Sequence, residues 1–147
     1  LTTKRHSISS IKKLMSIKSN ILLTISLRDK FGDQGIIGLC VAIKADKLQK
    51  ELIIDTFLMS CRALGRDAED ALWGALMRYS NNKGYEVLRA SYIASSKNMQ
   101  VASFYNRMGM TPQPSNDESN TQYFLNLPQR ENSPEWIETS FMESTNE

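Results

Sequence analysis

The sequence contains few of the residues that build metal centres and disulfide frameworks. Its 147 residues include two cysteines and one histidine. Cys40 and Cys61 are too far apart for a CxxC motif, and we interpret both as reduced, mostly buried thiols of a cytoplasmic protein. A structural zinc site is excluded, because it needs a cluster of such ligands. His6, the only histidine, has no evident partner, which argues against a Ser–His or Cys–His catalytic relay.

Long apolar runs are also missing. No segment approaches the roughly 20 apolar residues that a membrane helix needs, and basic residues interrupt every short apolar stretch near the N-terminus. We therefore expect neither a membrane span nor a signal peptide. The first 20 residues carry five basic residues and no acid, but this stretch is too short and too poor in aromatic residues to predict nucleic-acid binding. Residues 128–147 form an acidic tail, with five glutamates against one arginine.

The chain does contain a regular succession of periodic segments. Apolar residues at helical spacing predict a short helix over residues 7–19, with Ser7 as its cap. Alternation of apolar and polar residues predicts a half-buried strand over residues 21–28. After a turn with two glycines, apolar residues typical of β-structure predict two more strands, at 36–44 and 51–60. Short turns join the three strands, so they run antiparallel.

The apolar period then changes from 2 to 3.6. Residues 68–83 have one apolar face of about four helical turns, which Gly84 ends, and a strand follows at 86–93. This strand–helix–strand crossover predicts a right-handed parallel pair. The remaining predicted elements are a helix at 98–108, a loop at 111–121 and a last strand at 122–127. The predicted fold class is α/β, with a mixed, mostly antiparallel sheet flanked by helices. We expect one domain over residues 1–147.

The segment from Cys61 to Ala68 lies between a strand end and a helix start, and it has the features of an anion-binding loop. Backbone N–H groups there point outward beside the positive end of the helix dipole. Gly65 lets the backbone approach a ligand closely, and Arg62 and Arg66 add positive charge. The segment is neither a Walker loop nor a GxGxxG fingerprint. It predicts a site for a phosphate or pyrophosphate.

Arg62-x-x-Gly65-x-Asp67 resembles a signature of the Gcn5-related N-acetyltransferases, the GNAT family. In that family the pattern is Arg/Gln-x-x-Gly-x-Gly/Ala, and its loop cradles the pyrophosphate of coenzyme A. In this family the parallel strand pair splays apart and receives the extended arm of the coenzyme. The resemblance implies that the cofactor is held by Cys61, Arg62, Gly65, Arg66, Asp67 and Ala68.

Downstream, the pattern Asn98-x5-Phe-Tyr105-x3-Gly109-Met is similar to the second conserved block of the GNAT family. The Tyr of that block often serves as general acid to the leaving thiolate. The two motifs and the order of elements match over about residues 20–127. The resemblance implies a GNAT-like fold, Asn98 as a cofactor-binding residue, and coenzyme A or a phosphopantetheine thioester as the cofactor.

One position departs from the GNAT pattern. Asp67 stands where the family has Gly or Ala, and an Asp at a helix start is a good N-cap. With Asp70 three residues on, it imitates a capping box. Its carboxylate would then take the amides that a pyrophosphate needs and repel that anion, at a cost on the order of 1 kcal/mol at an exposed surface. Arg62 and Arg66 could offset this cost, so plain helix capping and a working anion site both stay open.

Three further residues have two interpretations each. Tyr105 is either a general acid or a packed aromatic residue whose hydroxyl finds a partner. Asp55, on the strand beside the expected cleft, is either a general base or a structural hydrogen-bonded carboxylate. Cys61 beside Arg62 is either a reactive thiolate or a buried inert thiol. The sequence does not decide between these interpretations.

A narrower resemblance extends over nearly the whole chain up to about Leu127. The segments that look like the C-terminal region of FkbH-like proteins are residues 1–5, 27–35 and 54–62, Lys97-Asn98 and Phe104-Tyr105. Those proteins make glyceryl and related acyl carrier protein thioesters for methoxymalonyl units, and a haloacid-dehalogenase-type (HAD-type) domain comes first in them. The resemblance implies an acyl carrier protein or the upstream HAD-type domain as partner. Because the chain starts at Leu1 and not at Met, we expect it to be a piece of a larger protein.

The sequence therefore supports two hypotheses. In the first, the domain is a GNAT-type acyltransferase that uses acetyl-CoA or an acyl carrier protein thioester. An amine attacks the thioester, and Tyr105 protonates the thiolate. In the second, the same fold is a non-catalytic module that docks a carrier protein or the upstream HAD-type domain. Asp67 favours the second hypothesis and the two motifs favour the first; neither hypothesis calls for a metal.

Overall fold

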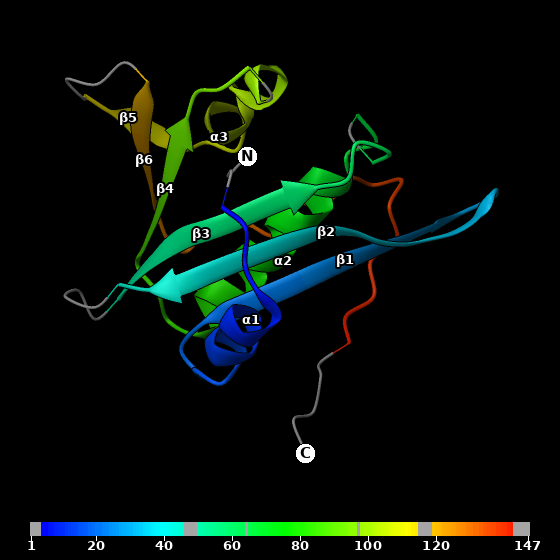
Figure 1. The fold of residues 1–147 in the computed structure, drawn as a ribbon, viewed down its shortest axis with the longest axis horizontal. Coiled ribbons are helices and arrows are strands. Elements are labelled where there is room, and N and C mark those ends of the chain that lie inside the picture. The colour runs from blue at the N-terminus through cyan, green and yellow to red at the C-terminus, as the bar shows by residue number, and fades with distance from the viewer. Residues whose placement is uncertain (1–3, 46–49, 64, 97, 115–118, 143–147) are drawn as a thin grey trace.

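The computed structural model describes residues 4–45, 50–63, 65–96, 98–114 and 119–142. Its centre is a six-stranded sheet with the strand order β1-β2-β3-β4-β6-β5. Helix α1 (Ile8–Met15) and the N-terminal segment lie on one face of the sheet, and helix α2 (Ala68–Asn82) covers the other (Figure 1). The predicted α/β class, a mixed and mostly antiparallel sheet flanked by helices, is confirmed.

The first three strands form the predicted antiparallel meander. They are β1 (Ile21–Asp29), β2 (Gly32–Lys44) and β3 (Glu51–Met59). Strand β2 begins at Gly32, four residues earlier than predicted, because Gly32 and Gly35 take the positive φ angles of 124° and 66° that a bulged hairpin end requires. Only two residues remain in the turn, where the amide of Phe31 donates to Asp29 Oδ1 at 2.8 Å.

Strand β4 (Val87–Ile93) follows α2 and runs parallel to β3, as predicted. The two strands pair only at their beginnings, through Glu51–Val87, Leu52–Leu88 and Ile53–Arg89. Beyond these pairs β3 continues alongside β2, whereas β4 continues alongside β6 (Asn120–Asn126). The facing edges therefore diverge (Figure 1). We name this region, residues 54–59 and 90–93, the open seam; it confirms the predicted splayed parallel pair.

The first helix is shorter than predicted. It begins after the predicted cap, Ser7, whose Oγ accepts from the amide of Ser10 at 3.2 Å, and it ends at Met15 instead of residue 19. Asn20 Nδ2 donates to the carbonyl of Leu14 at 3.0 Å. This side-chain bond satisfies one of the last helical carbonyls and turns the chain toward β1.

The predicted helix at 98–108 is divided into a 3₁₀ helix (Met99–Val101) and the short helix α3 (Phe104–Arg107). The side chain of Asn98 explains the interruption, because its bonds to backbone groups of the preceding loop compete with a regular helix start. Strand β5 (Thr111–Gln113) lies where we expected only a loop. It is an edge strand, where the missing amide of Pro112 is tolerated.

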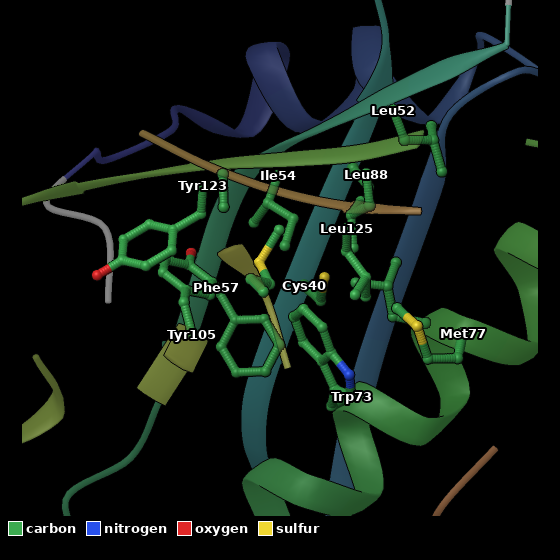
Figure 2. Close-up of a cluster of buried hydrophobic side chains, with 14 of the residues drawn as sticks. Cys40, Leu52, Ile54, Phe57, Trp73, Met77, Leu88, Tyr105, Tyr123 and Leu125 are labelled. Carbon is green, nitrogen blue, oxygen red and sulfur yellow. The ribbon is translucent and has the colours of Figure 1, made fainter. Parts of the chain in front are cut away.

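The main core lies between the sheet, α2 and α3. Figure 2 shows Phe57, Trp73 and Tyr105 packed together between the sheet and α2. The ring of Phe57 lies 5.0 Å from that of Phe104, and Trp73 meets Phe104 edge-on at 5.8 Å. Offset and edge-to-face contacts of this kind are favourable beyond the area that they bury. The core thus places an aromatic wall on one side of the open seam.

Two structural features are missing from the described ranges. No helix within them is long and apolar enough to cross a membrane. The same ranges hold no group of three or more His, Cys, Asp or Glu side chains that could bind a metal ion.

Candidate functional site

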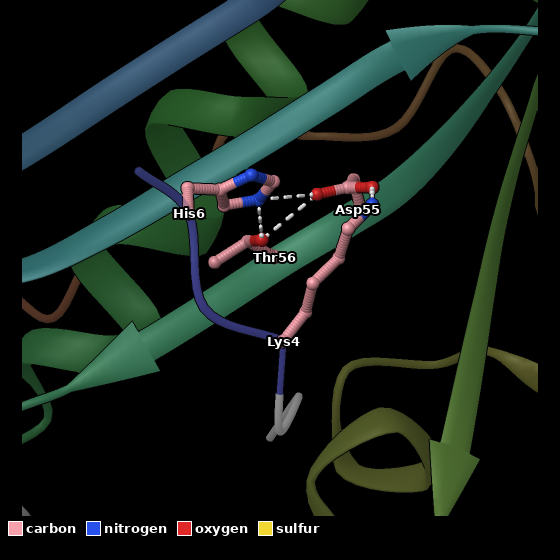
Figure 3. A network of polar contacts seen from close by, with 4 residues as sticks. All are labelled: Lys4, His6, Asp55 and Thr56. Atoms are coloured by element: carbon pink, nitrogen blue, oxygen red, sulfur yellow. Dashed lines mark hydrogen bonds and ion pairs between the residues drawn. The ribbon is translucent and has the colours of Figure 1, made fainter. Parts of the chain in front are cut away.

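Strand β3 carries a bulge at Asp55. Val41 and Ala42 of β2 pair with Thr56 and Ile54, so that Asp55 is the extra residue between them. A bulge bends the strand and breaks the strict alternation of its side chains. Asp55 and Thr56 consequently both point to the N-terminal segment (Figure 3), whereas Ile54 is part of the core.

The N-terminal segment, residues 4–7, crosses β3 at this bulge. Lys4 Nζ donates to Asp55 Oδ1, and His6 Nε2 lies 2.8 Å from Asp55 Oδ2 and 2.9 Å from Thr56 Oγ1 (Figure 3). The Thr56 hydroxyl donates to the same Oδ2 at 2.9 Å. Because a carboxylate only accepts, Nε2 of His6 carries the hydrogen. We name these four residues the Asp55 cluster. His6 does have a partner, so our expectation that it lacks one is wrong.

The Asp55 cluster sets the charge state of its carboxylate. Burial raises the pKa of Asp55, but hydrogen bonds from Lys4, Thr56 and His6 outweigh burial, and the net pKa is lowered. The side chain is only 8% exposed. A carboxylate with a lowered pKa stays ionised and is suited to holding a cation. This favours cation binding over the predicted role of Asp55 as general base, which stays untested.

The predicted anion loop is anchored by its small residues. Ala63 and Ala68 are buried against Ile37 in a second, small cluster. Gly65 is exposed with a φ of 75°, and a Cβ placed there would meet no atom within 4 Å. The backbone around Gly65 is therefore open to a ligand, as the sequence predicts.

The charged side chains of this loop differ in their partners. Arg66 forms an ion pair with Asp29 at the end of β1, and the hydrogen bond from this guanidinium lowers the pKa of Asp29. Among the described residues, Arg62 Nε approaches only a neutral group, Ser60 Oγ at 3.5 Å. Cys61 is exposed, so our interpretation of it as a buried thiol is wrong, whereas Cys40 is fully buried. Arg62 is thus the cation of the loop that a ligand can use.

Asp67 does not cap α2, which corrects our capping-box hypothesis. Its side chain makes no capping hydrogen bond, and its backbone is left-handed, with a φ of 57°. A capping residue normally has an extended backbone, which aims its side chain at the amides of the first turn. Asp70 is engaged elsewhere, since Arg107 of α3 donates to its two oxygens at 2.6 and 2.7 Å. The Asp67 carboxylate therefore leaves the first-turn amides of α2 to other acceptors.

Asn98 lies beside the wide end of the open seam and is buried. It donates to the carbonyl of Ile93 at 2.8 Å and accepts from the amide of Ser95 at 2.8 Å. Tyr92 donates to it as well, at 3.1 Å. These bonds occupy the side-chain amide, so Asn98 shapes the loop between β4 and α3. Its predicted role as a cofactor-binding residue is not tested by these contacts.

Tyr105 is the largest fully buried side chain and lies on the core side of β3 and β4. Its ring is 5.3 Å from that of Tyr123 and 6.4 Å from that of Trp73. Among the described residues its hydroxyl has no hydrogen-bond partner. Burial raises the pKa of this phenol. Tyr105 is thus packed, as one of our two interpretations holds, but its hydroxyl has not found the partner that this interpretation requires.

A hollow of the described surface lies away from these residues. It has a volume of about 360 Å³ and lies between α2, α3 and residues 129–132. Asp70, Trp73 and Arg107 are among its lining residues. None of the predicted site residues lines it, so the candidate site is defined by the open seam and its borders, not by this hollow.

Comparisons with known proteins identify the fold. No protein-family model matches the chain, and no curated protein matches it. Solved structures do. The GNAT domain of S. lividans PAT superposes with a TM-score of 0.66 at 15% identity, covering 84% of this chain and 70% of that one. The fold is the GNAT fold.

Other solved structures agree on this fold. Ard1 from Thermoplasma volcanium matches with a TM-score of 0.63 at 17% identity, over 85% of this chain and 82% of that one. An acetyltransferase from Thermus thermophilus matches with a TM-score of 0.60 at 14% identity, over 83% and 76%. Structural matches at identities this low establish the shared fold alone. The activity of the chain has to be argued from its own residues.

Sequence reasoning predicted most of the residues around this site, but it missed two of them, Lys4 and His6. Lys4 belongs to segment 1–5, which resembles FkbH-like proteins without indicating a role for Lys4, and both Lys4 and His6 lie about 50 residues from Asp55 along the chain. A second signal was the clustering of basic residues near the N-terminus, from which we predicted no site.

Proposed function

We propose that the domain is a GNAT-type acyltransferase that moves an acyl group from a coenzyme A or phosphopantetheine thioester to an amine. The observation that carries this proposal is the open seam, in which two parallel strands pair three times and then diverge. The facing edges of β3 and β4 offer backbone N–H and C=O groups to an extended arm, as an exposed sheet edge does to a peptide.

The loop before α2 is the part of the chain that would hold the phosphate end of the donor. Its open backbone at Gly65, the N-terminus of a 15-residue helix and the Arg62 guanidinium suit an anion. The Asp67 carboxylate opposes an anion by its charge, although it does not occupy the helix amides. We therefore propose a working but weakened anion site.

Tyr105 is suited to protonating the leaving thiolate. Burial raises its pKa, so the phenol is protonated near neutral pH, and its hydroxyl, which has no hydrogen-bond partner among the described residues, has an unmet hydrogen bond to offer. Asp55 lies on the opposite face of β3 and already holds an ammonium group, that of Lys4. We propose that Tyr105 protonates the leaving thiolate and that Asp55 binds the ammonium group of the acceptor.

The resemblance to FkbH-like proteins supports a narrower proposal. In it, an acyl carrier protein delivers the thioester within methoxymalonyl or glyceryl thioester biosynthesis, beside an upstream HAD-type domain. The exposed residues Cys61, Arg62 and Gly65 stand at the surface, where a protein-borne arm can reach them. A carrier protein arm has a single phosphate, whereas coenzyme A has a pyrophosphate as well, so the two donors can be told apart by binding.

A second candidate function is a docking module without chemistry. Two observations favour it: both oxygens of Asp55 are engaged, and Tyr105 is only 1% exposed. Such a module would bind the same arm in the same seam and would transfer nothing.

Thermal shift and turnover measured together test these proposals. With acetyl-CoA at about 100 times its dissociation constant, the midpoint of unfolding should rise by roughly 5 °C or more, because the ligand binds only the folded state. Free phosphopantetheine should raise the midpoint of unfolding by less if the loop binds the pyrophosphate. Arg62→Ala should reduce the acetyl-CoA shift, whereas Lys13→Ala on α1 should leave it unchanged. Binding with no transfer to any amine would select the docking module, and no shift with either ligand would refute both.

A further inference from the structure

We infer that Lys4 is an internal acyl acceptor, a residue that the domain acylates on its own chain. The inference rests on the proposed acyltransferase function and names the first amine that would use the site. Lys4 Nζ binds Asp55 Oδ1, which places a primary amine of this chain at the border of the open seam (Figure 3).

The position of the amine along the strand is the first argument. Asp55 lies on β3 two residues beyond Ile53, the last residue that pairs with β4. Two strand residues span roughly 6–7 Å. The ammonium of Lys4 is therefore bound where the two strands begin to part, which is where an arm lying in the seam passes the bulge.

The way the N-terminal segment is held is the second argument. His6 anchors it on Asp55 and Thr56 with a side chain that is 7% exposed, and Ser7 is fixed as the cap of α1. Lys4 is tethered only two residues from this buried anchor, and its own side chain remains 57% exposed. A tethered amine reacts as if it were highly concentrated, since its encounter with the seam costs little further entropy.

The reaction balances without any further reactant. The Lys4 ammonium first loses a proton to solvent, and the free amine attacks the carbonyl carbon of the thioester. A C–N bond forms and the C–S bond breaks. The nitrogen loses a second proton, and the thiolate leaves as a thiol after taking up one proton. The products are an amide on Lys4, a thiol and one proton released to solvent.

Acylation would also change the Asp55 cluster. An amide carries no charge, so an acylated Lys4 cannot form its ion pair with Asp55. The carboxylate would then be free to hold the ammonium of another acceptor. The inference thus predicts that the domain acylates Lys4 first and transfers acyl groups to other amines afterwards.

Peptide mapping by mass spectrometry tests the inference on the whole chain incubated with acetyl-CoA. Lys12 and Lys13 on α1 are exposed and serve as internal standards for uncatalysed acetylation. We expect Lys4 to be acetylated at least about 10-fold faster than Lys12, by the tethering argument. The rate constant should not change with protein concentration, because the acceptor and the seam belong to one molecule.

Variants sharpen the test. Asp55→Asn should bring the Lys4 rate down to that of Lys12, and Lys4→Arg should abolish modification at this position only. Lys12→Arg is the matched control and should leave the Lys4 rate unchanged. A Lys4 rate equal to that of Lys12, or one that rises in proportion to protein concentration, would overturn the inference.

Thermal shift with acetyl-CoA and transfer to an added amine are measured in parallel. If both succeed while Lys4 stays unmodified, only the inference fails. If neither succeeds, the proposed function fails and the inference fails with it.

Discussion

The two faces of β3 beside the open seam differ sharply in chemistry. On the face toward the N-terminal segment, the Asp55 cluster is charged and each of its four side chains has a partner. On the face toward α2, Phe57 and Tyr105 belong to an aromatic core, and the Tyr105 hydroxyl is among the buried polar groups without a partner in the described part of the chain. One strand thus separates a satisfied ionic site from an unsatisfied hydroxyl in apolar surroundings.

The bulge at Asp55 contributes to this difference. The bulge directs Asp55 and Thr56 to the same face, and the core residues resume on the other face at Phe57. Transfer of an acyl group to an amine needs a group that holds a cation and a group that gives a proton to a thiolate. In the proposed function, Asp55 binds the amine on one face and Tyr105 supplies the proton on the other. Four predictions test this comparison.

The largest expected effect is on the core face. Phe57→Ala should lower the free energy of unfolding by about 3–5 kcal/mol, because it leaves a cavity beside Trp73 and Phe104. Leu58→Ala is the matched control, since this neighbouring side chain is 37% exposed and should cost about 1 kcal/mol or less. Urea denaturation measures both. Equal losses would show that the two faces do not differ in packing as described.

Tyr105→Phe isolates the unpartnered hydroxyl. Turnover should fall by about 100-fold, the usual scale for losing a general acid. Stability should hold or rise slightly, because no hydrogen bond to a described residue is lost. Tyr85→Phe is the control: its hydroxyl donates to the carbonyl of Ser19 at 2.7 Å, and its loss should cost about 1 kcal/mol with turnover unchanged. A Tyr105→Phe protein that retains most of its turnover would exclude the role of general acid.

The ionic face should respond to pH. The pKa of Asp55 is lowered by folding, so its contribution to stability is fully present above the unfolded value of about 4 and is lost as pH falls through the folded pKa. Asp55→Asn should therefore destabilise the protein by about 1 kcal/mol at pH 6, after allowance for solvent screening, and by less near pH 3. Asp33→Asn in the exposed hairpin is the control and should change little. A difference that stays constant from pH 6 to pH 3 would contradict this account.

The smallest effect is expected at Asp67, on the border of the seam. Asp67→Gly removes a charge near the anion loop and relieves a left-handed backbone, so coenzyme A binding should tighten several-fold and stability should rise by about 0.5–1 kcal/mol. Asp67→Asn removes only the charge and should tighten binding without the gain in stability. Calorimetry with coenzyme A compares the three proteins. Equal or weaker binding by Asp67→Gly would show that the carboxylate is not in the way.

Much of the fold was determined by the sequence alone, because it rests on local patterns. The change of apolar period near residue 68 marks the end of the meander and the start of α2, and the crossover length makes β3 and β4 parallel. The open backbone at Gly65 was likewise predictable, since a glycine between a strand end and a helix start has few other uses. These features depend on residues that lie close together in the sequence.

Only the tertiary structure decided what the site residues do. The bulge at Asp55 is marked in the sequence only by two adjacent polar residues, Asp55 and Thr56, and such a break in alternation does not by itself tell which face each side chain takes. The partners of Asp55 are separated from it by 49 and 51 residues, a distance over which periodicity carries no information. The left-handed backbone of Asp67, and a Tyr105 hydroxyl without a partner among the described residues, likewise have no signature in the residue pattern. Residue types suggest the chemistry that is possible, whereas packing determines which groups meet.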